Sequence, residues 1–195
     1  MAVRPIRITG DPVLHTPAAP VTAWDDALQV LLIDMVDTMR TAPGVGLAAP
    51  QIGVSQQVFV WEWTDDDGVL QQGAVINPSL TVDPITRGKP DPEDDQEGCL
   101  SIPDFRYPLK RSERVILEGI SPQQERIHIE ASGWLARIFQ HEFDHLQGTL
   151  YVDRLRFRLR REAHSEIREQ GWGVPGLSWM PGVDRYESHH EAEEA

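Results

Sequence analysis

The chain has 195 residues, enough for one domain with a sizeable core, and its composition is ordinary for a globular protein, with 40% hydrophobic and 25% charged residues. The net charge of −13 excludes a generic nucleic-acid binder such as a DNA-binding protein, and the single cysteine excludes internal disulfide bonds. We expect no membrane contact and a cytoplasmic location, because no apolar run approaches the length of a membrane span and the N-terminal segment lacks the apolar stretch of a secretory signal.

An amphipathic helix is predicted over residues 24–41. Its apolar residues recur at three- and four-residue spacing and form one face for the core: Leu28, Leu31, Leu32, Met35, Val36 and Met39. Thr22 together with Asp25 resembles a capping box at the start of this helix. The uncharged segment 44–51 follows and is predicted to be a loop of small residues, which lets a backbone or a ligand approach closely.

Four β-strands are predicted in the middle of the chain. They cover residues 56–63, residues 73–77 ending at Pro78, and a hairpin of residues 113–120 and 125–131 around Ser121-Pro122. Between the second and third of these strands, the Pro-rich segment 83–97 holds six acidic residues against Arg87 and Lys89. We expect this segment to be a solvated loop, and its composition does not define a role for it.

A mostly apolar helix is predicted over residues 132–147, with Gly148 as its terminator. His141 and His145 are four positions apart, so they lie on one face of this helix and can bind the same metal ion. Glu142 follows the first histidine, where its carboxylate can accept a proton from a metal-bound water. This spacing is the H-E-x-x-H signature of metal-assisted hydrolysis.

A catalytic metal usually takes three protein ligands and leaves one position for water, so a third ligand is needed. One common completion requires a histidine where this chain has Tyr151. Glu162 or Glu166 could complete a metallopeptidase site, but both lie in an arginine-rich segment that offers them ordinary ion pairs. Cys99 is the better candidate, because its thiolate is a strong ligand for a divalent cation. A structural metal site in a binding protein normally has four protein ligands, which weighs against that alternative.

Three separate motifs resemble those of peptide deformylases and occur in the same order. Gly44–Gln51 resembles the G-x-G-L-A-A-x-Q motif of that family, Glu97–Ser101 matches its E-G-C-L-S motif, and Gln140–His145 matches its Q-H-E-x-D-H motif. The resemblance covers about residues 4–160. It implies an α+β fold in which antiparallel β-sheets pack around a central metal-binding helix, with N-terminal and C-terminal helices.

Two parts of the chain depart from the family pattern. The stretch between Ile76 and Glu97 is longer and more acidic than is usual in the family, so the rim of the site is expected to differ there. The Gly/Pro-rich end of the chain has no counterpart in the minimal family core. We therefore expect a single catalytic domain over residues 1–170 and an appended tail of unknown role over residues 171–195.

The resemblance implies a metal centre and its catalytic groups. One divalent metal ion, Fe(II) in the cell and Zn, Ni or Co as replacements, would be held by Cys99, His141 and His145. Glu142 would act as the general base on the attacking water and then as the general acid on the leaving amine. The side-chain amide of Gln51 and the backbone N–H of Leu100 would stabilise the oxyanion of the tetrahedral intermediate.

The implied substrate is the N-formylmethionyl end of newly made polypeptides, from which formate is released. The backbone of Val45 and Gly46 could pair with the substrate like an added strand. Val45 and Leu100 would contribute to an apolar pocket for the methionine side chain. Because formyl is the smallest acyl group, tight walls around the metal could exclude acetyl by steric clash.

Three further residues are expected to support the site without binding the metal themselves. Glu97 is expected to pair with Arg111, which lies at the spacing where the family has a basic partner. Asp144 faces away from the metal by helix geometry, and we expect it to anchor the helix or an outer hydrogen bond.

The segment 154–168 contains six arginines against Glu162 and Glu166 and is predicted to include a helix with a basic face. Local charge alone suggests that this face contacts ribosomal RNA near emerging nascent chains. Simple solvation of the basic face is the alternative.

Overall fold

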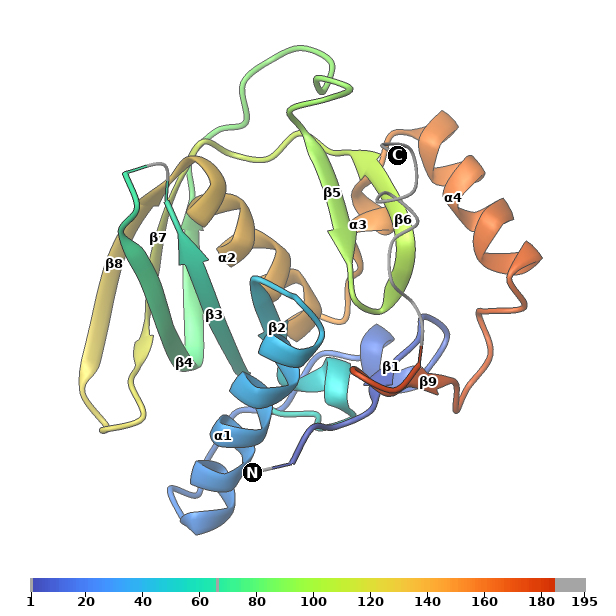
Figure 1. The fold of residues 1–195 in the computed structure, drawn as a ribbon. Coiled ribbons are helices and arrows are strands. Elements are labelled where there is room, and N and C mark those ends of the chain that lie inside the picture. The colour runs from blue at the N-terminus through green and yellow to red at the C-terminus, as the bar shows by residue number, and fades with distance from the viewer. Residues whose placement is uncertain (1, 66, 185–195) are drawn as a thin grey trace.

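The structure is a computed structural model that describes residues 2–65 and 67–184. It contains antiparallel strands that follow one another from β3 to β8 and helices that are largely grouped apart from them, which confirms the predicted α+β class (Figure 1). In chain order they are β1 (Ile6–Arg7), η1 (Pro12–His15), α1 (Asp26–Thr41), β2 (Gly46–Ala48), η2 (Ala49–Ile52), β3 (Val58–Thr64), β4 (Leu70–Val82), β5 (Gln96–Cys99), β6 (Ile102–Pro108), β7 (Arg114–Ile120), β8 (Arg126–Ser132), α2 (Gly133–Leu146), α3 (Tyr151–Arg154), α4 (Phe157–Glu169) and β9 (Ser178–Trp179).

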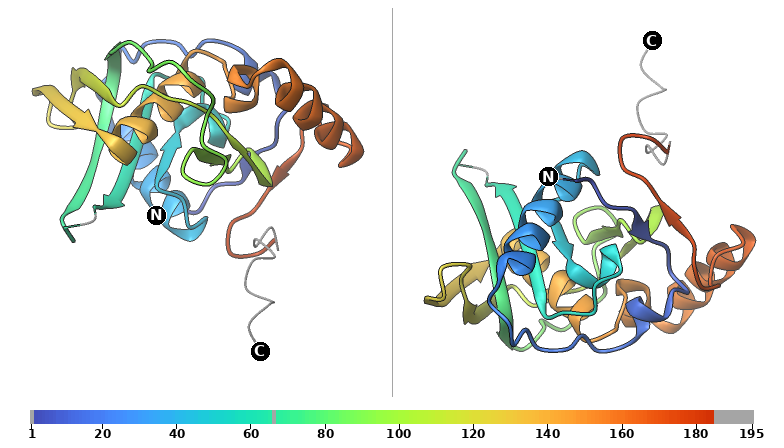
Figure 2. Two further views of the ribbon diagram at one scale, coloured as in Figure 1. Left: turned by 90° about the horizontal axis from the view of Figure 1, so that it is seen from above. Right: turned by 90° about the horizontal axis from the view of Figure 1, so that it is seen from below.

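A five-stranded antiparallel sheet in the order β2-β3-β4-β7-β8 forms one side of the molecule. The two-stranded pair β5-β6 lies on the other side, and α2 runs between them (Figure 1). Views from above and below place β8 and α4 at opposite ends (Figure 2). The central position of the helix that carries the H-E-x-x-H motif agrees with the predicted arrangement.

Helix α2 is buried because apolar and aromatic side chains cover it. The ring of Phe139 lies 6.0 Å from that of Phe59 and 5.0 Å from that of Trp61, both on β3. The helix ends where predicted, with Gly148 in the left-handed conformation at φ +69°. Polar side chains on a helix buried in this way must be paired or must bind a ligand, since unpaired burial costs free energy.

The start of α1 and the end of β4 differ from the predictions. Asp25, not Thr22, caps α1, with its Oδ1 accepting a hydrogen bond of 3.1 Å from the backbone N–H of Leu28. Strand β4 does not end at Pro78 but continues to Val82. A register shift between Ile76 and Ser79 accommodates the proline, because a bulge frees a residue from the ladder hydrogen bonds that proline cannot donate.

Two segments predicted as loops contain regular structure. The uncharged segment 44–51 forms β2, at the edge of the sheet, and most of the 3₁₀ helix η2. The acidic segment 83–97 is a largely exposed loop only as far as Asp95, because Gln96 and Glu97 already belong to β5 and Glu97 is buried. The site therefore gains more of its framework from strands than the sequence indicated.

The C-terminal segment is integrated more closely than the predicted appendage. Strand β9 pairs antiparallel with β1, and Trp179 on β9 is only 5% exposed. Residues 185–195 of the predicted tail lie outside the described residues. The predicted basic helix corresponds to α4, which begins at Phe157, whereas Arg154 ends the separate short helix α3. Within the described residues, no helix is both long and apolar enough to cross a membrane.

Candidate metal centre

Three side chains from β5 and α2 bring their ligand atoms together. The Cys99 Sγ lies 3.3 Å from His145 Nε2, and that nitrogen lies 3.3 Å from His141 Nε2. The three ligand atoms lie within 4.8 Å of one another. Cys99 is 42 positions before His141 in the chain, so the fold alone creates this grouping. The structure thus brings together the three residues predicted as metal ligands.

The donor set fits a divalent metal ion. With metal–ligand bonds of about 2.0–2.3 Å in a tetrahedral arrangement, neighbouring ligand atoms are separated by about 3.3–3.7 Å, and the two 3.3 Å separations agree with this spacing. One thiolate and two imidazoles suit Fe(II), Zn, Ni and Co alike. Three protein ligands leave a coordination position for water or substrate, as catalytic sites require.

Glu97 forms a close hydrogen-bond contact with His141. Its Oε1 lies 2.7 Å from Nδ1 of His141, the geometry of an N–H donated to a carboxylate. A neutral imidazole that uses Nδ1 in this way keeps the Nε2 lone pair for a metal. Burial alone would raise the pKa of Glu97. The charge of Arg111, together with the hydrogen bonds from Arg111 and His141, holds this pKa well below its usual range. Glu97 therefore remains an anion in the core.

Arginine side chains pair with this anion and with Asp144, and they anchor α2. Arg111 donates two hydrogen bonds of 2.6 and 3.0 Å to Glu97 and one of 2.7 Å to Asp144. Arg154 binds the other oxygen of Asp144 at 2.7 Å. Arg137 reaches Glu97 at 3.2 Å and Asp95 at 2.6 Å. This network connects β5, the segment after β6, and both ends of α2, and it fixes their positions relative to one another.

We expect replacement of Arg111 by methionine to lower the free energy of unfolding by about 3–5 kcal/mol, because two buried carboxylates lose their shared partner. Chemical denaturation of the metal-free protein measures the change. Arg40→Met is the matched control, since Arg40 pairs with Glu62 through a side chain that is 53% exposed, and water replaces that partner. Equal stability losses in the two variants would contradict the structural role of the buried network.

Glu142 directly follows the ligand residue His141 on α2 and is 3% exposed. Its Oε2 is buried and has no hydrogen-bond partner among the described residues. Burial raises the pKa of this carboxyl to about 7, with a further contribution from Glu97 and an opposing one from His141. A Cβ atom on Gly46 would lie 2.3 Å from Glu142 Oε1. Glycine at position 46 therefore leaves the room that this carboxylate occupies.

The remaining predicted residues line the same region. Gln51 is 1% exposed; its Oε1 accepts a hydrogen bond from Ala48 N at 2.8 Å, and its Nε2 donates toward Cys99 Sγ at 3.8 Å. Leu100 occupies the turn between β5 and β6, and its side chain approaches Gly44. Val45 precedes β2 and is 38% exposed at the rim.

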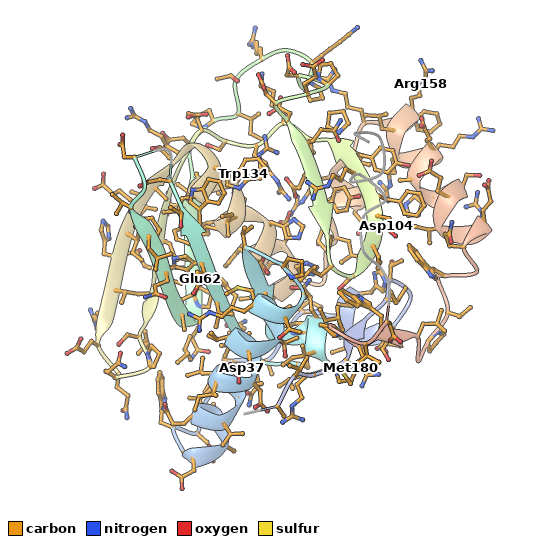
Figure 3. All side chains as sticks on the ribbon, in the orientation of Figure 1. Asp37, Glu62, Asp104, Trp134, Arg158 and Met180 are labelled. Atoms are coloured by element: carbon orange, nitrogen blue, oxygen red, sulfur yellow. The ribbon has the colours of Figure 1, made fainter. Side chains whose placement is uncertain are left out.

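Two supporting residues were not identified from the sequence. Arg137 lies one helical turn before His141, and its position on an otherwise apolar stretch of α2 was a usable signal. Its guanidinium also stacks 5.5 Å from the ring centre of Trp134, labelled in Figure 3. Tyr151 places its ring 6.1 Å from that of His141 and donates its hydroxyl to Phe105 O. Tyrosine is a common core residue, so no sequence pattern distinguished Tyr151.

The alternative third ligands lie elsewhere. Glu162 is exposed on α4, and Glu166 accepts a hydrogen bond from the hydroxyl of Tyr107. Neither carboxylate joins the cluster of Cys99 and the two histidines found among the described residues. The metallopeptidase alternative is therefore not favoured.

Comparison with known proteins agrees with this geometry. The family model described as Polypeptide deformylase matches residues 3–161. The chain is 49% identical to a peptide deformylase of Mycolicibacterium vanbaalenii over 94% of this chain and 97% of the relative. It is 46% identical to peptide deformylase 2 of Corynebacterium efficiens, with 98% and 100% covered.

Solved structures show the same fold. A peptide deformylase from Legionella pneumophila superposes with a TM-score of 0.74 at 35% identity, covering 87% of this chain and 96% of that one. The Synechococcus elongatus peptide deformylase in complex with actinonin gives a TM-score of 0.71 at 36% identity, with 88% and 91% covered. The motifs, the grouped ligands and these matches lead to one conclusion: the chain belongs to the polypeptide deformylase family.

Proposed function

We propose that this chain removes the formyl group from the N-formylmethionyl end of newly made polypeptides in the cytoplasm and releases formate. The observation that carries the proposal is the buried carboxylate of Glu142 beside the grouped ligand atoms of Cys99, His141 and His145. A metal held by Cys99, His141 and His145 would supply Lewis-acid chemistry, which lowers the pKa of a water molecule at the site. We propose Fe(II) as the metal in the cell, with Zn, Ni or Co as replacements; oxygen-sensitive activity together with metal analysis tests this assignment.

Glu142 would move the proton in both halves of the reaction. A carboxyl whose pKa is near 7 accepts a proton readily at neutral pH and also returns it readily. We propose that it takes the proton of the attacking water and then delivers it to the leaving amine. Gly46 supports this role by leaving space for the carboxylate next to β2.

The oxyanion of the tetrahedral intermediate would receive hydrogen bonds from Gln51 and Leu100. The Ala48 N–H fixes the amide of Gln51 through its oxygen, which leaves the amide nitrogen directed toward the Cys99 side of the site. Because a held amide does not reorient during the reaction, it stabilises developing charge efficiently. The backbone N–H of Leu100, in the turn after Cys99, is the second proposed donor.

We expect Gln51→Ala to lower kcat by about 100-fold, since one oxyanion donor is worth roughly 3 kcal/mol in the transition state. Steady-state formate release measures the change. Gln57→Ala is the matched control, because the Gln57 side chain is also hydrogen-bonded to the backbone, donating from Nε2 to Ala18 O at 3.2 Å, but Gln57 is not among the residues gathered at the site. A near-normal kcat for Gln51→Ala would remove Gln51 from this role.

The substrate backbone would pair with the segment at β2. This strand bonds to β3 on one side and is the edge of its sheet in the order observed, so its other edge can receive an extended peptide. We propose that Val45 and Gly46 provide these hydrogen-bonding groups. Val45 and Leu100 would also contact the methionine side chain.

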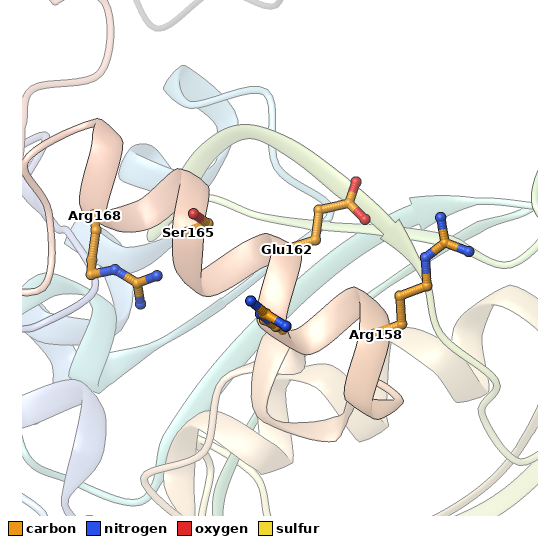
Figure 4. Close-up of a pocket in the computed structure, with 5 residues that line it drawn as sticks. Arg158, Glu162, Ser165 and Arg168 are labelled. Atoms are coloured by element: carbon orange, nitrogen blue, oxygen red, sulfur yellow. The ribbon is translucent and has the colours of Figure 1, made fainter.

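We also propose that α4 contacts the ribosome while nascent chains emerge. Arg158, Arg161 and Arg168 line a shallow hollow of about 300 Å³ on one face of α4, together with Glu162 and Ser165 (Figure 4). Arginine side chains of this kind bind phosphate oxygens of RNA.

Reversing the charge of Arg158, Arg161 and Arg168 to glutamate should abolish co-sedimentation with ribosomes. The control reverses Arg87, Lys89 and Arg126, which are exposed elsewhere and give the same change of net charge. Equal binding by the two triple variants would refute a contact through α4.

A further inference from the structure

One peptide unit beside the metal centre is held at both of its polar ends. The backbone N–H of Ser101 donates to Cys99 Sγ at 3.4 Å, and the carbonyl oxygen of the same unit, on Leu100, accepts from Trp179 Nε1 at 2.8 Å. The indole N–H and the ligand sulfur thus lie at opposite ends of one peptide group. Leu100 also carries the N–H proposed to stabilise the oxyanion.

The tryptophan is fixed by the paired ends of the described chain. Strand β9 pairs with β1 through Ile6 and Trp179, and Ile8 N donates to Leu177 O at 3.0 Å. The adjacent Thr9 N donates to Ser101 O at 2.9 Å, so the same N-terminal segment also holds the turn after Cys99. Figure 1 shows β1 and β9 next to the turn joining β5 and β6, and Met180 marks the end of β9 in Figure 3.

We propose that Trp179 is a positioning residue for the metal centre. By fixing the Leu100–Ser101 peptide, its indole N–H directs the Ser101 N–H to the Cys99 sulfur and sets the position of the Leu100 N–H. Donation to the carbonyl polarises the peptide group and strengthens the hydrogen bond at its other end. Because Trp179 is 5% exposed, water cannot readily replace its indole N–H. The inference deepens the proposed function and rests on it.

A pair of variants separates this role from general packing. Trp179→Phe removes the indole N–H and keeps an aromatic ring in the core. Trp61→Phe is the matched control, because Trp61 is also 5% exposed and packs in the Phe59 and Phe139 cluster. Replacing Trp179 by benzothienylalanine, which has sulfur in place of the N–H, preserves the shape of the indole if the phenylalanine variant folds poorly.

The first measurement uses the metal-free protein and does not depend on activity. Amide hydrogen exchange of Ser101, followed by NMR, should become at least about tenfold faster in Trp179→Phe and stay unchanged in Trp61→Phe. Unchanged exchange in Trp179→Phe, or equal acceleration in the two variants, would overturn the proposal. If Ser101 exchange is faster in Trp179→Phe as expected but the wild-type protein releases no formate, only the proposed function is overturned and the positioning role of Trp179 stands.

The second measurement reports the sulfur itself. In the cobalt-loaded protein, the sulfur-to-cobalt charge-transfer band should move to lower energy in Trp179→Phe, since a weaker hydrogen bond leaves the thiolate a stronger electron donor. We expect kcat to fall about fivefold with KM unchanged, the effect of one neutral hydrogen bond. A band at the wild-type position, or one moved equally in Trp61→Phe, would contradict the proposed link between Trp179 and Cys99.

Discussion

Replacing Glu142 with glutamine should lower kcat for formate release by about 10²–10⁴-fold, the usual contribution of a general acid–base. Glutamine has nearly the same shape as glutamate and can occupy the space beside Gly46, but it cannot accept the proton. The metal content should stay at the wild-type level, because Glu142 is not one of the three grouped ligands.

The same substitution should leave stability equal to or higher than that of the wild type. Burial raises the pKa of Glu142 to about 7, so the folded protein bears a cost for keeping this carboxylate charged above that pH. Thermal unfolding at pH 8 measures the difference. Glu130→Gln is the control, since that side chain is 81% exposed on β8. A Glu142→Gln variant with wild-type kcat would exclude proton transfer by this residue.

Replacing Cys99 with alanine should abolish both tight metal binding and formate release. Loss of an outer hydrogen-bond partner costs about 10–100-fold in metal affinity, and loss of one of three direct ligands costs more. Equilibrium dialysis against a competing chelator measures the affinity. The remaining donors, His141 and His145, would then be too few to hold the metal in a defined geometry.

This variant also separates the two hydrolase assignments. A metallopeptidase that uses Glu162 or Glu166 as third ligand would tolerate Cys99→Ala and retain its metal. Retention of the wild-type metal content in Cys99→Ala would therefore remove Cys99 from the ligand set. It would also reopen the metallopeptidase assignment, which is disfavoured because Glu162 and Glu166 lie on α4, outside the ligand cluster.

Local patterns predicted the helix that carries His141, Glu142 and His145, but not strands β2 and β5, which carry Gly46 and Cys99. Residues four positions apart lie on the same face of any helix. The spacing of His141 and His145 therefore predicted that both side chains point to one side of α2. Gly148 ended that helix as expected. The hairpin around Ser121-Pro122 formed because alternating residues on both sides match a half-buried sheet.

Features that depend on contacts distant in sequence were not predicted. Arg137 binds Asp95 and Glu97 across 42 and 40 positions, and Trp179 reaches Leu100 across 79. No local spacing specifies such partners. The continuation of β4 past Pro78 was missed because proline normally ends a ladder, and only the pairing partner β7 shows that a bulge accommodates it.

The most direct test of the proposed metal-dependent deformylase activity is formate release from formyl-Met-Ala-Ser, assayed anaerobically with the bound metal quantified in the same sample. Activity should rise in proportion to bound metal and vanish after chelation. The Cys99→Ala variant should fail by losing the metal, whereas Glu142→Gln should fail while keeping it. Formate release by the metal-free protein, or cleavage of the internal peptide bonds in place of formate release, would contradict metal-dependent deformylation by this chain.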